Sequence, residues 1–327
     1  MYVITGGAGF IGSNLAGGLE DRGENILIVD WLDSENKFQN IAKRKPVDVV
    51  PPEELFQSLA HHCGNIKGII HLGAISSTVE KDISLLNETN FELPVELWKW
   101  CTKNDTPFVY ASSAAVYGDG KCGFYDSLDA FSMNALRPLN PYGQSKLRFD
   151  KWVCQKVQND NGTPPHWAGL RFFNVYGPNE YHKKNQSSMV WQLFNQISAR
   201  SPARLFASNH PDYSDGEQKR DFIGVDDCVD IICWLIDTPT ANGIFNVGIG
   251  SSRSFLDLAH AVFGALNRVA NIEFIPMPEE IEPAYQYCTR ANIHRLRAAG
   301  FRDHLTSLED GVARYIREFL MTGDPYR

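Results

Sequence analysis

The chain has 327 residues, of which 43% are hydrophobic and 21% are charged, a balance typical of an ordinary globular protein. This length provides for a large core and predicts two lobes. The net charge of -8 and the pI near 5.6 argue against the basic surface that nucleic-acid binding needs, so we expect no nucleic-acid partner.

A short apolar strand at residues 2–5 runs directly into a glycine-rich turn and a helix at 13–22. Gly6, Gly9 and Gly12 have the spacing G-x-x-G-x-x-G. Such glycines permit a tight turn, the approach of a diphosphate to bare backbone, and close packing of helix on strand. A glycine triplet alone is also compatible with a simple turn. The order strand, glycine turn, helix predicts a dinucleotide site.

The second strand, at residues 26–29, ends in Asp30, where a carboxylate would meet the adenosine ribose of a dinucleotide. Asp30 alone favours NAD, because a carboxylate suits a free 2'-hydroxyl and repels a 2'-phosphate. Lys37 and the basic run 43–45 favour NADP, since a phosphate needs cationic partners. A basic run is also an ordinary solvated surface. We expect mainly NADP, with NAD as the alternative.

Further apolar segments alternate with helix-like ones along the first half of the chain. The expected strands are 47–50, 67–71, 107–111 and 167–173. This alternation predicts an α/β fold, a Rossmann-type doubly wound parallel sheet with a smaller substrate-binding lobe. Ligands bind beyond the carboxyl ends of such strands, where loop 72–78 and Ser113 should lie. Asn90, just before an expected helix at 91–103, should face the cofactor.

Tyr142 and Lys146 are four residues apart in a segment with helical periodicity, so both side chains project from one helix face. An ammonium group one turn away favours the phenolate and lowers the pKa of the phenol, which would make Tyr142 a base. Tyr117 and Lys121 have the same spacing, but two glycines between them disfavour a helix. We interpret that second pair as a coincidence in a loop. A buried aromatic at a helix start is the alternative for Tyr142.

The composition becomes polar and basic at 180–184 and then alternates between apolar and mixed segments. The elements expected there are a helix at 187–198, a strand at 221–225, a helix ending at 237, a strand at 243–248, a helix at 255–266 after the N-cap Ser254, a strand at 272–275 and a helix from Ser307. We assign residues 1–174 and 221–248 to the dinucleotide-binding domain, and residues 175–220 and 249–327 to the substrate-binding lobe.

The seven cysteines contain no C-x-x-C pair, which fits a reducing cytoplasm better than a disulfide framework or a zinc site. The nine histidines do not group at metal-ligand spacing, so we expect no metal. The first residues run directly into a strand, which leaves no room for a signal peptide. The apolar run near 231–236 is far too short to span a bilayer. We expect a cytoplasmic protein with no membrane partner.

Three motifs resemble the extended short-chain dehydrogenase/reductases of the nucleotide-sugar-modifying branch, and the resemblance covers the whole chain. These motifs are Ser113-Ala-Ala-Val-Tyr-Gly118, Asn140-Pro-Tyr-Gly-Gln-Ser-Lys146 and Arg171-Phe-Phe-Asn-Val-Tyr-Gly-Pro178. Shorter segments resemble the ADP-L-glycero-D-manno-heptose 6-epimerase family: Ile75-Ser-Ser-Thr78, Glu180-Tyr-His-Lys183, Lys219-Arg-Asp-Phe222 and Tyr285-Gln286. The resemblance implies NADP-dependent epimerisation of an ADP-heptose for lipopolysaccharide core precursors, by a homo-oligomer for which a pentamer is one form.

The resemblance also implies roles for the matched positions. Tyr142 and Lys183 would be the two acid/base residues, assisted by Ser113 and Lys146. The implied cofactor contacts are Gly6, Gly9, Phe10, Ile11, Gly12, Asp30, Lys37, Leu72, Gly73, Ala74, Ile75, Ser76, Asn90, Lys146 and Val175. The implied substrate contacts are Ser76, Ser77, Thr78, Ser113, Asn174, Asn185, Gln192, Phe206, Arg220 and Tyr285. Arg220 should hold the diphosphate, because a guanidinium grips two phosphate oxygens; the alternative is an exposed arginine paired with Asp221.

The chain departs from the family pattern in three places. The family's lysine near the third strand is missing beside Pro51-Pro52, Gln192 replaces a substrate-facing histidine, and 184–186 replaces a Gly-Ser-Met run. A dehydratase is a rival function, but its relatives usually carry Asp-Glu where Ala114-Ala115 follow Ser113 here. Another nucleotide-sugar 4-epimerase, a net NADPH-dependent reductase and a non-catalytic dinucleotide sensor remain as alternatives.

Overall fold

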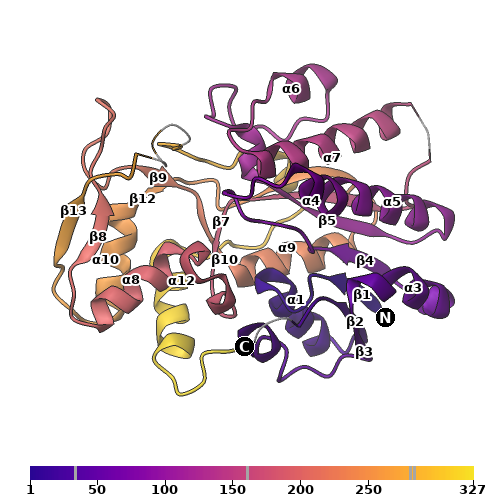
Figure 1. The fold of residues 1–327 in the computed structure, drawn as a ribbon, viewed down its shortest axis with the longest axis horizontal. Coiled ribbons are helices and arrows are strands. Elements are labelled where there is room, and N and C mark those ends of the chain that lie inside the picture. Colours follow the sequence, from indigo (N-terminus) through magenta and orange to yellow (C-terminus); the bar gives the residue numbers. More distant parts are fainter. Residues whose placement is uncertain (33–34, 160–161, 280–281, 283–284) are drawn as a thin grey trace.

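The computed structural model describes residues 1–32, 35–159, 162–279, 282 and 285–327. Seven strands form one parallel sheet in the order β11-β6-β5-β4-β1-β2-β3. The smaller lobe lies beside this sheet, as Figure 1 shows. The predicted Rossmann-type doubly wound fold is confirmed.

The strands are β1 (Tyr2–Thr5), β2 (Ile26–Val29), β3 (Asp48–Val50), β4 (Gly68–His71), β5 (Phe108–Ser113), β6 (Trp167–Phe172), β7 (Asn174–Tyr176), β8 (Ala203–Phe206), β9 (Lys219–Arg220), β10 (Phe222–Gly224), β11 (Gly243–Val247), β12 (Arg253–Ser254) and β13 (Ile272–Ile275). The helices are α1 (Phe10–Asp21), α2 (Glu35–Gln39), α3 (Leu55–His62), α4 (Ile83–Asn87), α5 (Leu93–Lys103), α6 (Ala130–Ala135), α7 (Pro141–Gln158), α8 (Met189–Ser198), α9 (Val225–Asp237), α10 (Phe255–Ala265), α11 (His294–Ala299) and α12 (Leu308–Tyr315). Shorter helical turns are η1 (Pro52–Glu54), η2 (Cys63–Asn65), η3 (Glu88–Glu92), η4 (Ala114–Tyr117), η5 (Tyr181–Gln186) and η7 (Ile316–Leu320).

The inner strands are apolar and buried on both sides, which is why they form a parallel sheet covered by helices. One face packs against α1, α9 and α11, whose buried side chains include Leu15, Ile231 and Leu296. The other face packs against α3, α5 and α7, whose buried side chains include Leu59 and Trp98. Because these strands run in parallel, the carboxyl ends of β1, β2, β4, β5 and β6 lie at one edge of the sheet.

The smaller lobe has its own core, built from α8, α10 and α12 around β8 and β13. Strand β13 pairs in parallel with β8, from Ile272 opposite Ala203 to Ile275 opposite Phe206. The sequence predicted β13 with the same bounds. Helix α11 belongs to the range 249–327 but lies on the large sheet next to β11, so this part of the lobe's chain returns to the larger core.

Two expected helices begin earlier in the structure than in the sequence-based assignment. Helix α1 begins at Phe10, with Gly9 as an N-cap that has no side chain to offer. The helix expected from residue 91 begins in η3, and Pro94 occupies the first turn of α5, where a missing N–H costs little.

Candidate active site

A cavity of about 900 Å³ lies at the carboxyl edge of the large sheet, where it meets the smaller lobe. Loops that follow β1, β2, β4, β5 and β6 reach this cavity, as expected for ligand sites in such sheets. The predicted site residues that line it are Gly6, Gly9, Phe10, Ile11, Gly12, Asp30, Lys37, Leu72, Gly73, Ala74, Ile75, Ser76, Thr78, Ser113, Tyr142, Lys146, Asn174, Val175 and Lys183.

The glycine turn presents bare backbone to the cavity. Gly6 has φ +67° and lies so close to the next loop that a Cβ would stand 2.6 Å from the Gly73 nitrogen. A Cβ on Gly12 would overlap the Gly6 carbonyl oxygen. Because Gly9 caps α1 without a side chain, the first N–H groups of this helix remain available to an anion. This cradle fits a dinucleotide diphosphate.

Asp30 lies directly after β2 and lines the cavity. One carboxylate oxygen accepts a hydrogen bond from the Ala8 N–H at 2.9 Å, and the other forms an ion pair with the Lys37 ammonium at 2.7 Å. The basic run expected to help a 2'-phosphate points elsewhere. Lys43 pairs with Asp324 at 2.7 Å and Arg44 with Glu20 at 3.3 Å; neither basic residue lines the cavity.

Asn90 lies behind loop 72–78. Its side chain is fully buried, accepts a hydrogen bond from the Ile75 N–H at 3.0 Å, and donates to the Ile75 carbonyl at 2.9 Å and to Ser145 Oγ at 3.0 Å. Asn90 therefore holds loop 72–78 against α7 and does not line the cavity itself. Ser77 likewise does not line the cavity, although its hydroxyl accepts a hydrogen bond from Gln186 at 3.0 Å.

Helix α7 presents Tyr142 and Lys146 to the cavity from one face. Its start is fixed by Asn140, whose side chain accepts from the Gly143 N–H at 2.8 Å, and by Pro141 in the first turn. Lys146 donates to the Ala111 carbonyl at 2.9 Å. Burial lowers the pKa of Lys146 to about 8.

The predicted effect of Lys146 on Tyr142 is wrong. Burial raises the pKa of Tyr142, and a hydrogen bond with Ser113 opposes this rise only in part. The expected lowering fails because the phenol loses solvation of its anion while the ammonium is itself desolvated and engaged by backbone. Tyr142 is therefore held as a protonated phenol next to Ser113.

The Tyr117 and Lys121 spacing is a coincidence, as expected, because the two side chains have different partners. Tyr117 lies in η4 and donates to Asn246 Oδ1 at 2.6 Å, and it accepts from Arg171 at 3.0 Å. Lys121 is exposed and pairs with Asp119.

Lys183 reaches the same cavity from η5, the loop beyond β7. Its ammonium lies 5.5 Å from the centre of the Phe10 ring. Burial lowers the pKa of Lys183, and the negative charge of Glu180 opposes this shift. The neighbouring cation Lys184 is exposed and is not among the causes of the shift. The desolvation of Lys183 itself is the physical cause.

The remaining predicted substrate contacts lie on the side of the smaller lobe. Arg220 is 8% exposed, and its guanidinium lies 5.0 Å from the Tyr285 ring centre and 5.4 Å from that of Phe255. The Phe206 ring centre is 6.3 Å from that of Tyr285. Asn185 and Gln192 lie near each other on the surface side of η5 and α8, outside the lining of the cavity.

Arg220 is not paired with Asp221, which was the alternative considered for it. The Asp221 carboxylate is fully buried and accepts hydrogen bonds from the N–H groups of Ile249, Gly250 and Ala291 at 2.7 to 2.9 Å. The Arg220 guanidinium donates to the Lys219 carbonyl at 2.8 Å and forms no ion pair with a carboxylate among the described residues, and burial lowers its pKa. A buried guanidinium of this kind is suited to an anionic ligand.

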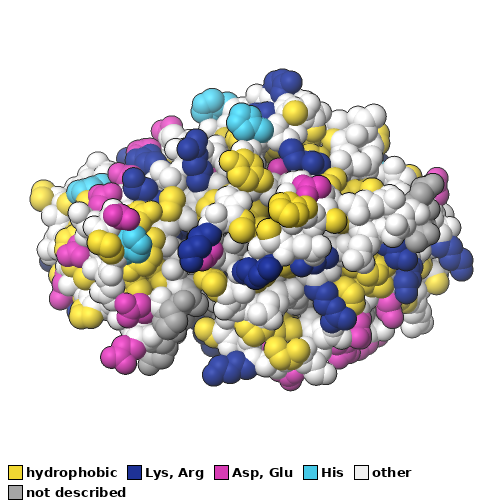
Figure 2. Space-filling model, turned by 90° about the horizontal axis from the view of Figure 1, so that it is seen from above, with side chains coloured by type: hydrophobic (Ala, Val, Ile, Leu, Met, Phe, Trp, Pro, Cys, Tyr) yellow, Lys and Arg dark blue, Asp and Glu magenta, His cyan; other side chains and the backbone are white. Residues whose placement is uncertain are grey.

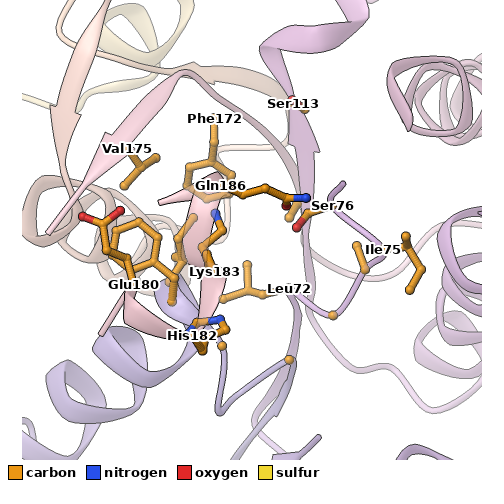
Figure 3. A pocket seen from close by; sticks show the side chains of 18 of the residues that line it. Leu72, Ile75, Ser76, Ser113, Phe172, Val175, Glu180, His182, Lys183 and Gln186 are labelled. Carbon is orange, nitrogen blue, oxygen red and sulfur yellow. The ribbon is translucent and has the colours of Figure 1, made fainter. Parts of the chain in front are cut away.

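Sequence reasoning missed several residues of the cavity. Gln186 extends toward Ser76 on the opposite wall, and His182 lies beside Lys183 (Figure 3). Glu180 also lines the cavity and is 1% exposed. Its position in the Glu180-Tyr-His-Lys183 motif was the one signal that could have identified it, because a buried carboxylate three residues from a buried lysine tunes the charge of that lysine.

Among the described residues, no group of three or more His, Cys, Asp or Glu side chains is arranged to hold a metal ion, and no helix is long and apolar enough to cross a bilayer. Figure 2 shows Lys and Arg side chains interspersed with acidic and apolar ones over the face that it presents.

Comparisons with known proteins agree with this geometry. Residues 2–248 match the model of the NAD dependent epimerase/dehydratase family. The chain is 44% identical over 329 residues to the ADP-L-glycero-D-manno-heptose-6-epimerase of Nitratidesulfovibrio vulgaris (strain DP4), covering 100% of both chains. It is 40% identical over 335 residues to the protein of that name from Fusobacterium nucleatum, again covering 100% of both.

A solved structure is similar over nearly the same length. The crystal structure of Helicobacter pylori ADP-L-glycero-D-manno-heptose-6-epimerase matches with a TM-score of 0.79 and 28% identity, covering 97% of this chain and 95% of that one. This structural match agrees with the fold described above. The chain belongs to the NAD dependent epimerase/dehydratase family and, within it, to the branch of the ADP-L-glycero-D-manno-heptose-6-epimerases.

Proposed function

We propose that this protein converts ADP-D-glycero-D-manno-heptose into ADP-L-glycero-D-manno-heptose by transient oxidation at C6 of the heptose. The observation that carries the proposal is that two separate proton-transfer groups, Tyr142 and Lys183, line one cavity that also contains a dinucleotide cradle. The names of the full-length relatives support the choice of sugar. We further propose that the product serves lipopolysaccharide core synthesis and that the protein works as a cytoplasmic homo-oligomer.

The need for two bases follows from the geometry of inversion. A bound nicotinamide supplies a site that takes up a hydride from C6 and later returns it to the opposite face. The oxygen on C6 therefore occupies two positions, and proton transfer needs heavy atoms within roughly 2.6 to 3.2 Å of each. Tyr142 serves one position from α7, and Lys183 serves the other from η5.

The surroundings of the two groups prepare them for this task. Tyr142 is kept as a phenol by burial, and its hydrogen bond with Ser113 orients the hydroxyl. Burial moves Lys183 toward the neutral amine, which can accept a proton. By microscopic reversibility, the group that removes the proton in one direction donates it in the other. Both states of each residue are therefore used in every complete cycle.

The rest of the substrate is assigned to the smaller lobe. We propose that Arg220 binds the diphosphate, since it is a buried cation stacked between Tyr285 and Phe255. Binding of the diphosphate at a distance from C6 keeps the substrate in the site while the C6 ketone presents its other face to the nicotinamide. Phe206 and Tyr285 then border the adenosine, and Asn174 and Gln186 border the heptose.

The rival reactions lack support in the site. Elimination of water by a dehydratase needs a further acid and base next to Ser113, but Ala114 and Ala115 occupy these positions in η4. A net reductase uses the same residues as an epimerase. The two functions are distinguished by whether product forms over many turnovers without added NADPH. A non-catalytic sensor would not need Tyr142 and Lys183 to face one cavity.

The test is incubation of the purified protein with ADP-D-glycero-D-manno-heptose and no added nucleotide, followed by proton NMR of the heptose. We expect the L-glycero epimer to accumulate to an equilibrium mixture over many turnovers. A product that forms only with stoichiometric NADPH would establish the reductase instead. If the heptose is untouched while UDP-glucose is epimerised at C4, the assigned sugar is wrong.

A further inference from the structure

A second carboxylate stands at the adenosine end of the cavity, outside the residues so far assigned to it. Glu53 lies in η1, the turn between β3 and α3, directly after Pro52, which lines the cavity. Its two carboxylate oxygens accept hydrogen bonds from the Trp31 indole N–H at 3.0 and 3.2 Å. Trp31 follows Asp30 and also lines the cavity, although 45% of it is exposed. Glu53 itself is exposed and does not line the cavity, but the indole holds its carboxylate next to two residues that do, Trp31 and Pro52.

The backbone under Glu53 is restricted before any ligand binds. Pro51 has φ -68° and ψ 153°, and Pro52 occupies the first position of η1, so both prolines limit the approach of the chain to this turn. A carboxylate held by a short turn and an indole N–H loses little freedom when a ligand arrives. Its charge is thus a fixed feature of the site.

The charges at this end of the cavity do not suit a phosphate. Asp30 and Glu53 contribute two carboxylates, and Lys37 contributes one ammonium, which already pairs with Asp30 at 2.7 Å. Lys43 and Arg44 pair with acidic residues away from the cavity. A 2'-phosphate carries roughly two negative charges, and it would enter a region whose assigned side chains sum to a negative charge.

A free 2'-hydroxyl, unlike a 2'-phosphate, is compatible with these carboxylates. A hydroxyl can donate to the Asp30 carboxylate, and it adds no charge next to Glu53. We propose that Glu53, fixed by Trp31, makes the site select a nicotinamide dinucleotide with an unphosphorylated adenosine ribose, so that NAD is preferred to NADP. This revises the expectation of NADP, which depended on Lys37 and the basic run 43–45. It rests on the proposed function only in that the cavity holds a nicotinamide dinucleotide.

The experiment is calorimetric titration of the full-length protein, freed of nucleotide, with NAD and with NADP separately. For the unaltered protein we expect a Kd for NADP at least about ten times that for NAD. Nucleotide released by denaturing the freshly purified protein should be NAD when identified by mass spectrometry. Both readouts are independent of epimerisation.

Three variants test whether Glu53 is the residue that causes the preference for NAD over NADP. Glu53→Lys should strengthen NADP binding about tenfold or more and change NAD binding less than about threefold, because the reversed charge meets only the phosphate. Glu53→Gln should give a smaller change in the same direction. Glu54→Lys is the matched control, since Glu54 is the next glutamate of the same exposed turn, whereas it is Glu53 that accepts the hydrogen bonds of the Trp31 indole. We expect Glu54→Lys to leave the ratio of the two Kd values within about twofold.

Each result decides the matter. Equal or tighter binding of NADP by the unaltered protein overturns the proposal, and so does an equal effect of Glu54→Lys and Glu53→Lys. If NAD is preferred as described but no heptose is epimerised with either nucleotide, the proposed function fails and the selectivity stands. If neither nucleotide binds, both are refuted.

Discussion

The Glu180 carboxylate accepts a hydrogen bond from the Tyr315 hydroxyl at 3.1 Å and so joins the loop that carries Lys183 to helix α12 of the smaller lobe. The same carboxylate accepts from the Ser188 backbone N–H and from Ser188 Oγ, which fixes the start of α8. Burial raises the pKa of Glu180, and these hydrogen bonds oppose the rise. Glu180 is therefore a residue that positions the loop carrying Lys183. Its negative charge also raises the pKa of Lys183.

Replacing Glu180 by glutamine should move the pH dependence of catalysis. Burial lowers the pKa of Lys183 and Glu180 raises it, so removing the negative charge should lower the Lys183 pKa further. The limb of the kcat profile that belongs to Lys183 should therefore shift to lower pH. Tyr315→Phe is the control, because it removes a hydrogen bond to Glu180 and keeps the charge. An identical shift in both variants would show that Glu180 acts through loop position alone.

Removing the guanidinium of Arg220 should weaken substrate binding. A lost charge-assisted contact to phosphate is worth roughly 1.5 to 3 kcal/mol, which corresponds to a rise in KM of about ten- to a hundredfold. Arg220→Ala should leave the retention of bound dinucleotide unchanged, because Arg220 does not line the main cavity. Lys219→Ala, at the adjacent position of β9, is the control variant whose KM is compared with that of Arg220→Ala. Steady-state kinetics with the ADP-heptose measures both, and an unchanged KM for Arg220→Ala would remove this residue from the substrate site.

His71 should make the folded protein sensitive to acid. It is 1% exposed at the end of β4, contacts Thr5 Oγ1 at 2.7 Å, and burial lowers its pKa to about 3 from an ordinary value of 6.5. Below pH 6.5 the unfolded chain binds a proton at this position while the folded chain does not, so stability is present above that pH and is lost as pH falls. The contribution to the slope approaches about 1.4 kcal/mol per pH unit.

The His71→Asn variant tests this contribution through denaturant unfolding at several pH values. An amide oxygen can replace the ring nitrogen as partner of Thr5, and asparagine cannot be protonated in this range. The variant will be less stable at neutral pH, because a buried ring is lost. Its stability should nevertheless fall less steeply than that of the parent between about pH 6.5 and about pH 4.5. Parallel curves for the two proteins would contradict the assignment.

The two proton-transfer residues should each be indispensable. Tyr142→Phe and Lys183→Met should each reduce epimerisation by about a hundredfold to ten-thousandfold, since each removes one acid/base group. Bound dinucleotide, measured by absorbance after purification, should remain. Lys184→Met is the matched control for charge, because Lys184 is the exposed neighbour. Near-normal epimerisation by Lys183→Met would mean that Tyr142 works alone.

Much of the large sheet could be predicted because its signals are local. The apolar runs of β1 and β2 and the glycine turn between them lie within a few residues, and the bounds of both strands agree with the structure. The start of α1 was placed too late because a glycine N-cap leaves no side-chain signal. Tyr142 and Lys146 were paired correctly, since helical spacing alone sets their common face.

The side-chain contacts that could not be predicted depend on partners far along the chain. Lys43 was expected near the cofactor, but it pairs with Asp324 in the C-terminal segment. Asn90 was expected to face the cavity, yet its partner Ser145 holds it behind the loop. The pKa of Tyr142 was predicted in the wrong direction, because burial is a property of the folded chain and spacing does not report it.

Transient oxidation at C6 with return of the same hydride is the central claim, and an isotope label tests it most directly. ADP-D-glycero-D-manno-heptose carrying deuterium at C6 is incubated with the protein in ordinary water, without added nucleotide, and the L-glycero product is examined by NMR and mass spectrometry. We expect the deuterium to remain at C6 of the product, because the hydride never exchanges with solvent. Replacement of the deuterium by solvent hydrogen would contradict it and would indicate inversion by proton abstraction from carbon.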